Sequence, residues 1–311
     1  MIMRIGILCN SRIALPALNQ LLHSGLVAGV AVPAGAREIH QLVQQLCTRY
    51  KIAVKQFSRK DFTAQLEIWL KDIKPDAVLV KTFPYLIPAR CINLPRHGFI
   101  NFHYAPLPGW RGPNPLFWMI RNRETAGAVT AHRMNESFDE GPLLLEQPVP
   151  LSPGVNAGLY TTQLAYAGLQ LTLQLLQGLA GGTLVPRAQD HTTAKWWKRP
   201  VATDLFINWQ LMSADEILAL VNACNPAMKG AVVKWKGWIF GLTDITIPGN
   251  NHNGSKPGTV LSINETEGLT IACRDNRIIK AEVVYCEEGY YAGHRLSLFG
   301  LKAHELLEDP L

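Results

Sequence analysis

Strand-like apolar runs alternate with helical segments through the first hundred residues, and this alternation constrains the fold more than any other feature. The runs that read as buried strands are 3–9, 26–32, 77–80 and 98–102. Segments with apolar residues at helical spacing lie between them, at 14–23, 40–50 and 62–70. Strands that alternate with helices are typical of α/β proteins. We therefore predict a doubly wound, mainly parallel sheet in the first part of the chain.

The carboxyl ends of these strands are the expected ligand-binding edge. In open α/β sheets ligands bind beyond that edge, where the loops 81–88 and 101–108 would emerge. The loop after the first strand, 9–12, reads Cys-Asn-Ser-Arg and contains no glycine. Because it lacks the Gly-x-Gly-x-x-Gly pattern that admits a pyrophosphate, a nicotinamide dehydrogenase is disfavoured.

Asn101, His103 and Asp139 are the candidate catalytic residues. Asn101 and His103 are two residues apart at the end of an apolar run, so on a strand both side chains would leave the same face. Asp139 lies in a turn that ends at Gly141 and could close on that face, orient the imidazole and keep it protonated. An amide, an imidazole and a carboxylate around one point suit acyl transfer, because two groups can hold an oxyanion while the third handles protons.

These motifs resemble the folate-dependent formyltransferases, which include the methionyl-tRNA, glycinamide ribonucleotide and amino-sugar enzymes. The segments 101–108 (Asn-Phe-His-Tyr-Ala-Pro-Leu-Pro), 111–112 (Arg-Gly) and 139–141 (Asp-Glu-Gly) are similar to that family's Asn-x-His-x-Ser-Leu-Leu-Pro, Arg-Gly and Asp-x-Gly elements. The resemblance implies a formyltransferase-like Rossmann variant with Asn101, His103 and Asp139 as its catalytic triad. Ala105 and Pro106 replace the usual Ser-Leu, and Glu140 replaces the usual Thr.

The resemblance also implies the co-substrate, 10-formyltetrahydrofolate. The family lays the pterin ring of this folate on the loop that corresponds to 81–88. We expect cofactor contacts from six residues: Phe83, Tyr85, Leu86, Ile87, Phe138 and Gly141. Substrate contacts are expected from five others: Arg12, Lys81, Tyr104, Trp110 and Arg111. No metal site is predicted.

The second half has a different texture. A long packed helix is expected over about 155–185, and an irregular connection with a Trp-Trp-Lys-Arg run follows it. That run is either a linker anchored by apolar rings or a basic, aromatic contact for a phosphate-bearing substrate. Five short strand-like runs then occupy 231–240, 242–247, 258–263, 269–273 and 278–285, after a helix capped by Ser213 and Glu216. The resemblance implies a small OB-like barrel, which a helix over 299–307 would close. The predicted division is a catalytic domain (1–185), a linker (186–204) and the OB-like domain (205–311).

Charge favours a small-molecule amine, such as an amino sugar or a biosynthetic intermediate, as the formyl acceptor. Residues 1–202 carry 21 Lys and Arg against 11 Asp and Glu, or +10, whereas 203–311 carry 9 against 13, or −4. Binding of tRNA depends on many phosphate contacts, so an acidic second domain disfavours the alternative acceptor, methionyl-tRNA. The basic insertion that the tRNA enzymes carry after their second strand is also missing around 30–37. A formyltetrahydrofolate hydrolase, a non-enzymatic RNA-binding protein and a catalytically silent relative stay open as other classes.

Six scattered cysteines indicate buried free thiols rather than a disulfide framework or a zinc site. The first apolar run is too short for a signal-peptide core, and the long low-charge stretch carries several polar residues. We therefore expect a cytoplasmic protein with no membrane partner. The oligomeric state is left open, with a homodimer as one option.

Overall fold

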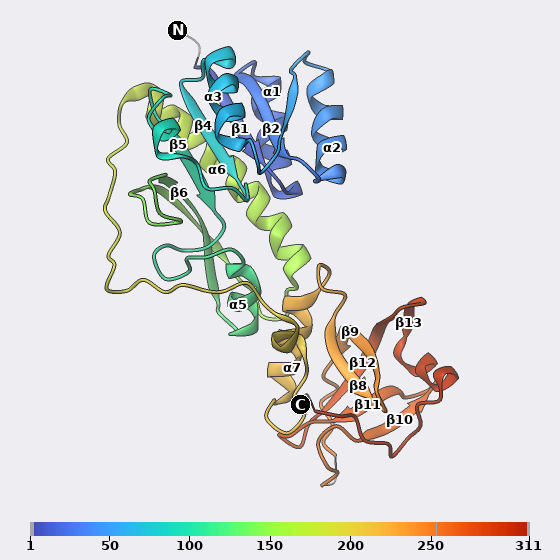
Figure 1. Ribbon diagram of the computed structural model, residues 1–311. Coiled ribbons are helices and arrows are strands. Elements are labelled where there is room, and N and C mark those ends of the chain that lie inside the picture. Colours follow the sequence, from blue (N-terminus) through green and yellow to red (C-terminus); the bar gives the residue numbers. More distant parts are fainter. Residues whose placement is uncertain (1–2, 253, 310–311) are drawn as a thin grey trace. The chain divides into compact units, whose positions relative to one another are not determined.

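The sheet of the first unit has seven strands in the order β3-β2-β1-β4-β5-β6-β7 (Figure 1). Strands β1 to β5 run parallel, and β6 and β7 add to one edge antiparallel. The strand bounds are β1 (Ile5–Cys9), β2 (Val27–Pro33), β3 (Val54–Phe57), β4 (Ala77–Lys81), β5 (Phe99–His103), β6 (Ala126–Arg133) and β7 (Leu143–Pro150). The mainly parallel sheet predicted from the alternating pattern is therefore confirmed.

This computed structural model describes residues 3–252 and 254–309. It divides into two compact units that do not follow a single cut of the chain. The first comprises Met1–Pro115, Ala126–Pro150 and Thr161–Trp197, and the second comprises Leu116–Thr125, Leu151–Tyr160 and Lys198–Leu311. The helices are α1 (Leu15–His23), α2 (Arg37–Thr48), α3 (Phe62–Ile73), α4 (Ala89–Ile92), α5 (Pro115–Arg121), α6 (Ala157–Gly181) and α7 (Ala214–Cys224). The predicted domain boundaries stay a prediction.

Side chains alternate between the two faces of the sheet, and the faces are covered by different helices. Val78 and Val80 of β4 belong to one core cluster with Leu66, Trp69 and other apolar residues of α3. Lys81, the next residue on β4, points to the opposite face and reaches Thr172 of α6. The reversal of strand order between β1 and β4 is the kind of point where α/β sheets bind ligands.

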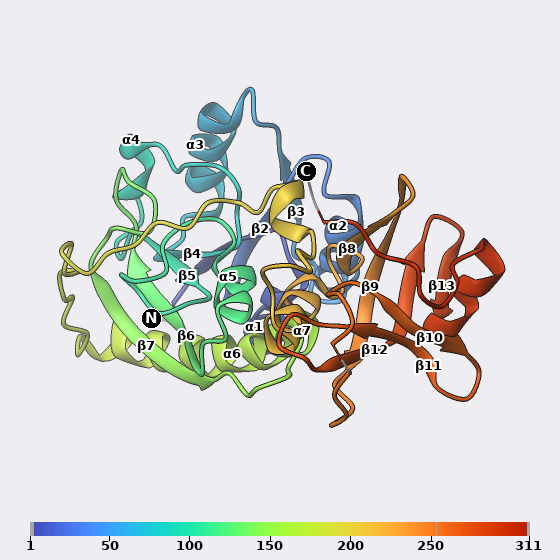
Figure 2. The same ribbon diagram turned by 90° about the horizontal axis from the view of Figure 1, so that it is seen from below.

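The second unit contains an antiparallel sheet in the order β10-β11-β12-β9-β8, and β13 also pairs with β12. Figure 2 shows β9, β12 and β13 side by side. The strands are β8 (Ala231–Trp235), β9 (Trp238–Thr246), β10 (Val260–Asn264), β11 (Gly268–Ala272), β12 (Ile278–Cys286) and β13 (Gly289–Ala292). Helix α7 begins as expected, because Ser213 and Glu216 form a reciprocal capping box.

The helix predicted over 299–307 is wrong. A 3₁₀ helix spans Gly293–Phe299 instead and ends at Gly300, whose φ of 100° is left-handed. Beyond it the backbone is extended: Glu308 bridges to Lys234 of β8, and Leu306 bridges to Thr259 beside β10. The two edge strands thus meet the same terminal segment, and these backbone bonds outweigh the helical spacing of its apolar residues.

All six cysteines are buried and unpaired, as the sequence predicts. No helix within the described parts of the chain is long and apolar enough to cross a membrane.

Candidate active site

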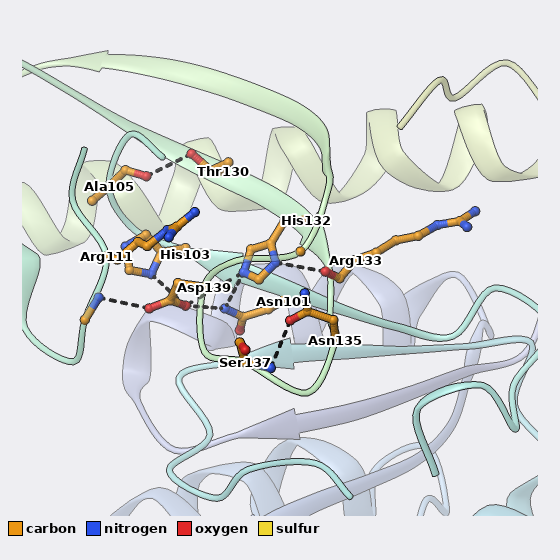
Figure 3. Close-up of polar contacts among 12 residues, drawn as sticks. Asn101, His103, Ala105, Arg111, Thr130, His132, Arg133, Asn135, Ser137 and Asp139 are labelled. Atoms are coloured by element: carbon orange, nitrogen blue, oxygen red, sulfur yellow. Dashed lines mark hydrogen bonds and ion pairs between the residues drawn. The ribbon is translucent and has the colours of Figure 1, made fainter. Parts of the chain in front are cut away.

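The end of β5 presents Asn101 and His103 on one face of the sheet. The intervening Phe102 points to the other face, where its ring lies under the Lys81 amine. His103 is 7% exposed and Asn101 is half-buried. The two-residue spacing predicted this shared face, and Figure 3 shows both side chains directed toward Asp139.

Asp139 lies in the turn between β6 and β7 and joins the two β5 residues. Its Oδ1 is 3.4 Å from Nδ1 of His103 and accepts a 3.4 Å hydrogen bond from Nδ2 of Asn101. Its Oδ2 accepts a 3.0 Å bond from the backbone N–H of Gly112. Asp139 has a φ of 55°, a left-handed conformation that Asp tolerates better than most residues. The structure therefore brings together the three residues that the sequence singled out (Figure 3).

His132 is a fourth member of the cluster that the sequence reasoning missed. It faces Asn101 across the β5–β6 pairing and is 1% exposed. Its Nδ1 donates to the carbonyl of Arg133 at 3.0 Å, so its Nε2 accepts the 3.1 Å bond from Nδ2 of Asn101. Both amide hydrogens of Asn101 are then engaged, and the amide orientation is fixed. The available signal was a histidine within the apolar run 127–134, where a buried imidazole needs partners.

The electrostatics of His103 and Asp139 are coupled. Burial lowers the pKa of His103 below its ordinary value, although the Asp139 carboxylate and the Trp110 carbonyl both act to raise it. Burial alone would raise the pKa of Asp139, but the charge of His103, a hydrogen bond from His132 and the Gly112 N–H together lower it to about 2. The expectation that Asp139 keeps His103 charged is thus met in direction only, because desolvation of the imidazole outweighs the carboxylate.

His103 nevertheless has an acceptor at each ring nitrogen. The Trp110 carbonyl lies 2.6 Å from Nε2, and a carbonyl can only accept, so Nε2 carries the proton. Nδ1 faces the Asp139 carboxylate. An imidazolium formed during a reaction would find both of its N–H groups matched, whereas the resting ring is neutral by burial. The site is therefore arranged to take up a proton at Nδ1.

Arg111 has a different role from the substrate contact expected of it. Its side chain is 5% exposed and donates through Nε and Nη2 to Oε1 of Gln189, at 3.2 and 2.8 Å. Nη1 forms an ion pair with Glu140 at 3.2 Å. Gln189, which the sequence did not single out, donates from Nε2 to the carbonyls of Asp139 and Gly141 at 2.8 Å each. Arg111 and Gln189 therefore fix the turn that carries Asp139.

The catalytic loop is held by the segment that follows α6, which returns as an extended chain (Figure 1). Arg111 exchanges backbone hydrogen bonds with Lys195 and Trp197. Trp110 stacks on Trp197 with ring centroids 4.5 Å apart and an interplanar angle of 11°. Trp197 Nε1 donates to the carbonyl of Gly109 at 3.1 Å. For Trp197 this supports the interpretation of the Trp-Trp run as an anchored segment, and Trp110 is occupied by the stack.

Lys81 and Tyr104 are buried against α6, which contradicts the substrate contacts expected of them. Lys81 is 1% exposed, donates to Thr172 at 3.0 Å and lies 3.2 Å from the centroid of the Phe102 ring. Burial lowers the pKa of Lys81 well below its ordinary value. The Tyr104 ring packs against Gly168 of α6, and its hydroxyl has no partner among the described residues. Arg12 is exposed but forms an ion pair with Glu38 of α2.

The residues expected to hold folate fall into two groups. Ile87 is 1% exposed within the core, and Phe83 and Tyr85 pack against that core through edge-to-face contacts with Phe62 and each other. Leu86 and Phe138 are 43% and 46% exposed, so they alone of the apolar set offer open surface for a flat ring.

Gly141 is buried for a packing reason, since a Cβ there would lie 1.7 Å from the Arg133 carbonyl. The loop after β4 fits a folate through Leu86 and its exposed backbone at Thr82 and Pro84. Ile87 and Gly141 do not offer direct contacts.

Comparisons with known proteins agree with this geometry. The family model described as formyl transferase matches residues 17–176, and its C-terminal domain model matches 201–288. The methionyl-tRNA formyltransferase of Pseudomonas syringae pv. tomato is 32% identical over 238 residues, 76% of this chain and 73% of that protein. The enzyme of the same name from Clostridium botulinum is 27% identical over 94% of this chain and 97% of its own length.

Solved structures share the fold at lower identity. HypX from Aquifex aeolicus in complex with tetrahydrofolic acid superposes with a TM-score of 0.67 at 21% identity; 95% of this chain is covered, but only 47% of HypX. An N-formyltransferase from Helicobacter canadensis, in complex with folinic acid and dTDP-3-aminofucose, has a TM-score of 0.67 at 15% identity and covers 93% of this chain. With the matched family model spanning half of the sequence and a relative at 32% identity, the chain belongs to the formyl transferase family.

Proposed function

We propose that this chain transfers a formyl group from 10-formyltetrahydrofolate to an amino group of its acceptor. The observation that carries the proposal is the convergence of Asn101, His103 and Asp139 on one point, with His132 fixing the amide. The folate supplies the formyl group when bound. Names of relatives and neighbours support the same donor, because the HypX and Helicobacter canadensis structures contain folates.

The side chains suit the charge changes of this reaction. As the amine adds to the formyl carbon, negative charge builds on the formyl oxygen and a proton must leave the nitrogen. The Asn101–Asp139 bond of 3.4 Å is the longer of the two amide bonds, so this N–H is the one that would turn to the oxygen. Nδ1 of His103 would receive the proton, because Asp139 and the Trp110 carbonyl stabilise the imidazolium that results.

Methionyl-tRNA is the acceptor that the relatives support best. The Clostridium botulinum enzyme aligns over 97% of its length, which includes the second unit as well as the catalytic one. This outcome favours the alternative over the small amine expected from charge. Two observations still support a small amine as the second candidate. The connection from β2 to α2 is only Ala34–Ala36, so no basic insertion is present there, and residues 203–311 carry a net charge of −4.

The decisive experiment measures formyl transfer to charged initiator tRNA and to a panel of amino sugars, at about 50 and 200 mM salt. With tRNA as the true acceptor, several phosphate contacts make the binding fall by orders of magnitude over that range. With a small amine, the loss stays within roughly tenfold. Product formed with neither acceptor, by hydrolysis of the donor alone, would replace both readings with a hydrolase.

Folate binding and catalysis are tested separately. Calorimetry with 5-formyltetrahydrofolate, a stable mimic of the donor, should give a measurable heat; none at millimolar ligand contradicts the proposal. The Asp139→Asn variant should keep this binding but lower the rate by about 100-fold or more, because its neutral amide stabilises an imidazolium far less. Near wild-type turnover by that variant would remove the assigned role.

A further inference from the structure

A cavity of about 460 Å³ lies within the second unit and has no role in the chemistry described above. It is enclosed by the end of α5 and the turn after it (120–125), the loop 151–155 and one face of α7. Its volume lies within the range of small-molecule sites, roughly 300 to 1,000 Å³. The walls include Leu151, Pro153, Val155 and Leu218, so a ligand would meet mainly apolar surface.

Helix α7 places a buried amide in this cavity. Asp215, Leu218, Ala219 and Asn222 line it, and their spacing puts all four side chains on one helix face. Asn222 is only 9% exposed, yet its side chain forms no hydrogen bond with any residue of 3–252 or 254–309. An unpartnered buried amide is costly to the folded state unless something supplies the missing bonds. Asn222 therefore points to a ligand that offers a donor and an acceptor side by side.

The rim carries two charges that are also unused. No carboxylate of the described residues lies within ion-pair distance of Arg123, although its charge acts with other groups to lower the pKa of Glu216. Glu124 beside it has no cationic partner in the described chain. The other acidic residue of the cavity, Asp215, is already held by both Nη atoms of Arg277, at 3.1 and 2.8 Å. The groups left for a ligand are one guanidinium, one carboxylate and the Asn222 amide.

We propose that this cavity binds an adenine mononucleotide. Asparagine pairs with adenine through two adjacent hydrogen bonds, which would satisfy both halves of the Asn222 amide. The base would lie against the apolar walls at Leu218 and Val155. Arg123 at the rim would bind the phosphate, a group that guanidinium matches with paired N–H donors, and Glu124 would accept from a ribose hydroxyl.

The same chemistry has two sources, a free nucleotide or the adenosine at the 3′ end of an RNA. The site does not depend on the proposed formyl transfer, because binding is measured without donor or acceptor. The test is calorimetry of the full chain with AMP, with UMP as the base control, and with a CCA trinucleotide as the RNA arm. We expect AMP to bind at least about tenfold more tightly than UMP, since one bidentate base contact supplies that discrimination. Tighter binding of the trinucleotide than of AMP would identify the RNA end as the source.

Variants distinguish a ligand group from a structural one. Asn222→Leu keeps a similar volume and should weaken AMP binding about tenfold or more, while the midpoint of unfolding stays the same or rises because an unpartnered amide is removed. Arg123 has a φ of 58°, which Asn tolerates, so Arg123→Asn removes the charge without new strain and should also weaken AMP. Lys51→Asn, another exposed basic residue at φ 58°, is the matched control.

Equal binding of AMP and UMP, no heat at millimolar AMP, or unchanged affinity in Asn222→Leu would each overturn the proposal. A lower unfolding midpoint in Asn222→Leu with unchanged AMP affinity would show a purely structural amide.

Discussion

Replacement of Gln189 by Leu is the sharpest test of how the Asp139 turn is held. The side chain is 5% exposed and makes four hydrogen bonds: two from its Nε2 to backbone carbonyls, and two accepted by Oε1 from Arg111. Leucine fills similar space but leaves two carbonyls and a buried guanidinium without these partners. At about 1 kcal/mol for each neutral bond and about 2 for the charged pair, the variant should lose about 4 kcal/mol of unfolding free energy.

The measurement is urea denaturation, accompanied by the rate of formyl transfer under conditions where the variant is folded. We expect the rate to fall at least about tenfold, since a small displacement of Asp139 from His103 disturbs proton transfer. Gln170→Leu, on the exposed face of α6, is the control and should change stability by about 0.5 kcal/mol or less. A loss below about 1 kcal/mol with an unchanged rate would refute the clamp. Gln189→Glu separates its two halves, because it keeps an acceptor for Arg111 but removes both donors to the turn.

Three further predictions concern Asp139, Lys81 and Gly141. Because the pKa of Asp139 is lowered to about 2, its contribution is present above the ordinary carboxylate pKa and lost as pH falls toward 2; wild type should lose about 2 kcal/mol more than Asp139→Asn between about pH 4 and 2 in urea titrations. The folded-state pKa of Lys81 is depressed, so only the unfolded lysine is charged at neutral pH; stability should rise from about pH 7 to 10 in wild type, and Lys81→Met should be more stable at pH 7 and flatten that rise. Gly141→Ala should lose about 3 kcal/mol or more in thermal unfolding, because its Cβ meets the Arg133 carbonyl, whereas Gly109→Ala, which faces open space, should lose little.

The sequence predicts those parts of the fold that local patterning determines. The parallel strands, the long helix and the capping box of α7 follow from periodicity and capping residues that lie close together in the chain. Strands β3 and β7 were not predicted: β3 has only four residues and is mostly exposed, and β7 contains two prolines. The terminal segment failed as a helix because its backbone partners lie on distant strands, which no local pattern reveals.

The candidate site shows the same division. Asn101 and His103 could be paired from the two-residue period of a strand, and the resemblance supplied Asp139. His132 and Gln189 could not be paired with them, because strand register and the return of the chain after α6 bring them there. Lys81 was misjudged for a related reason: its place at a strand end was clear, but the side-chain parity that turns it toward α6 was not applied.

The return of the chain past the catalytic loop bears on where this protein can be cut. A fragment that ends at residue 185 would retain Asn101, His103 and Asp139 but would lack both Gln189 and Trp197. During synthesis from the amino end, the three catalytic side chains likewise emerge well before the segment that steadies their loop. The smallest active piece of this enzyme therefore extends at least to residue 197, beyond the last residue of any strand or helix in its first unit.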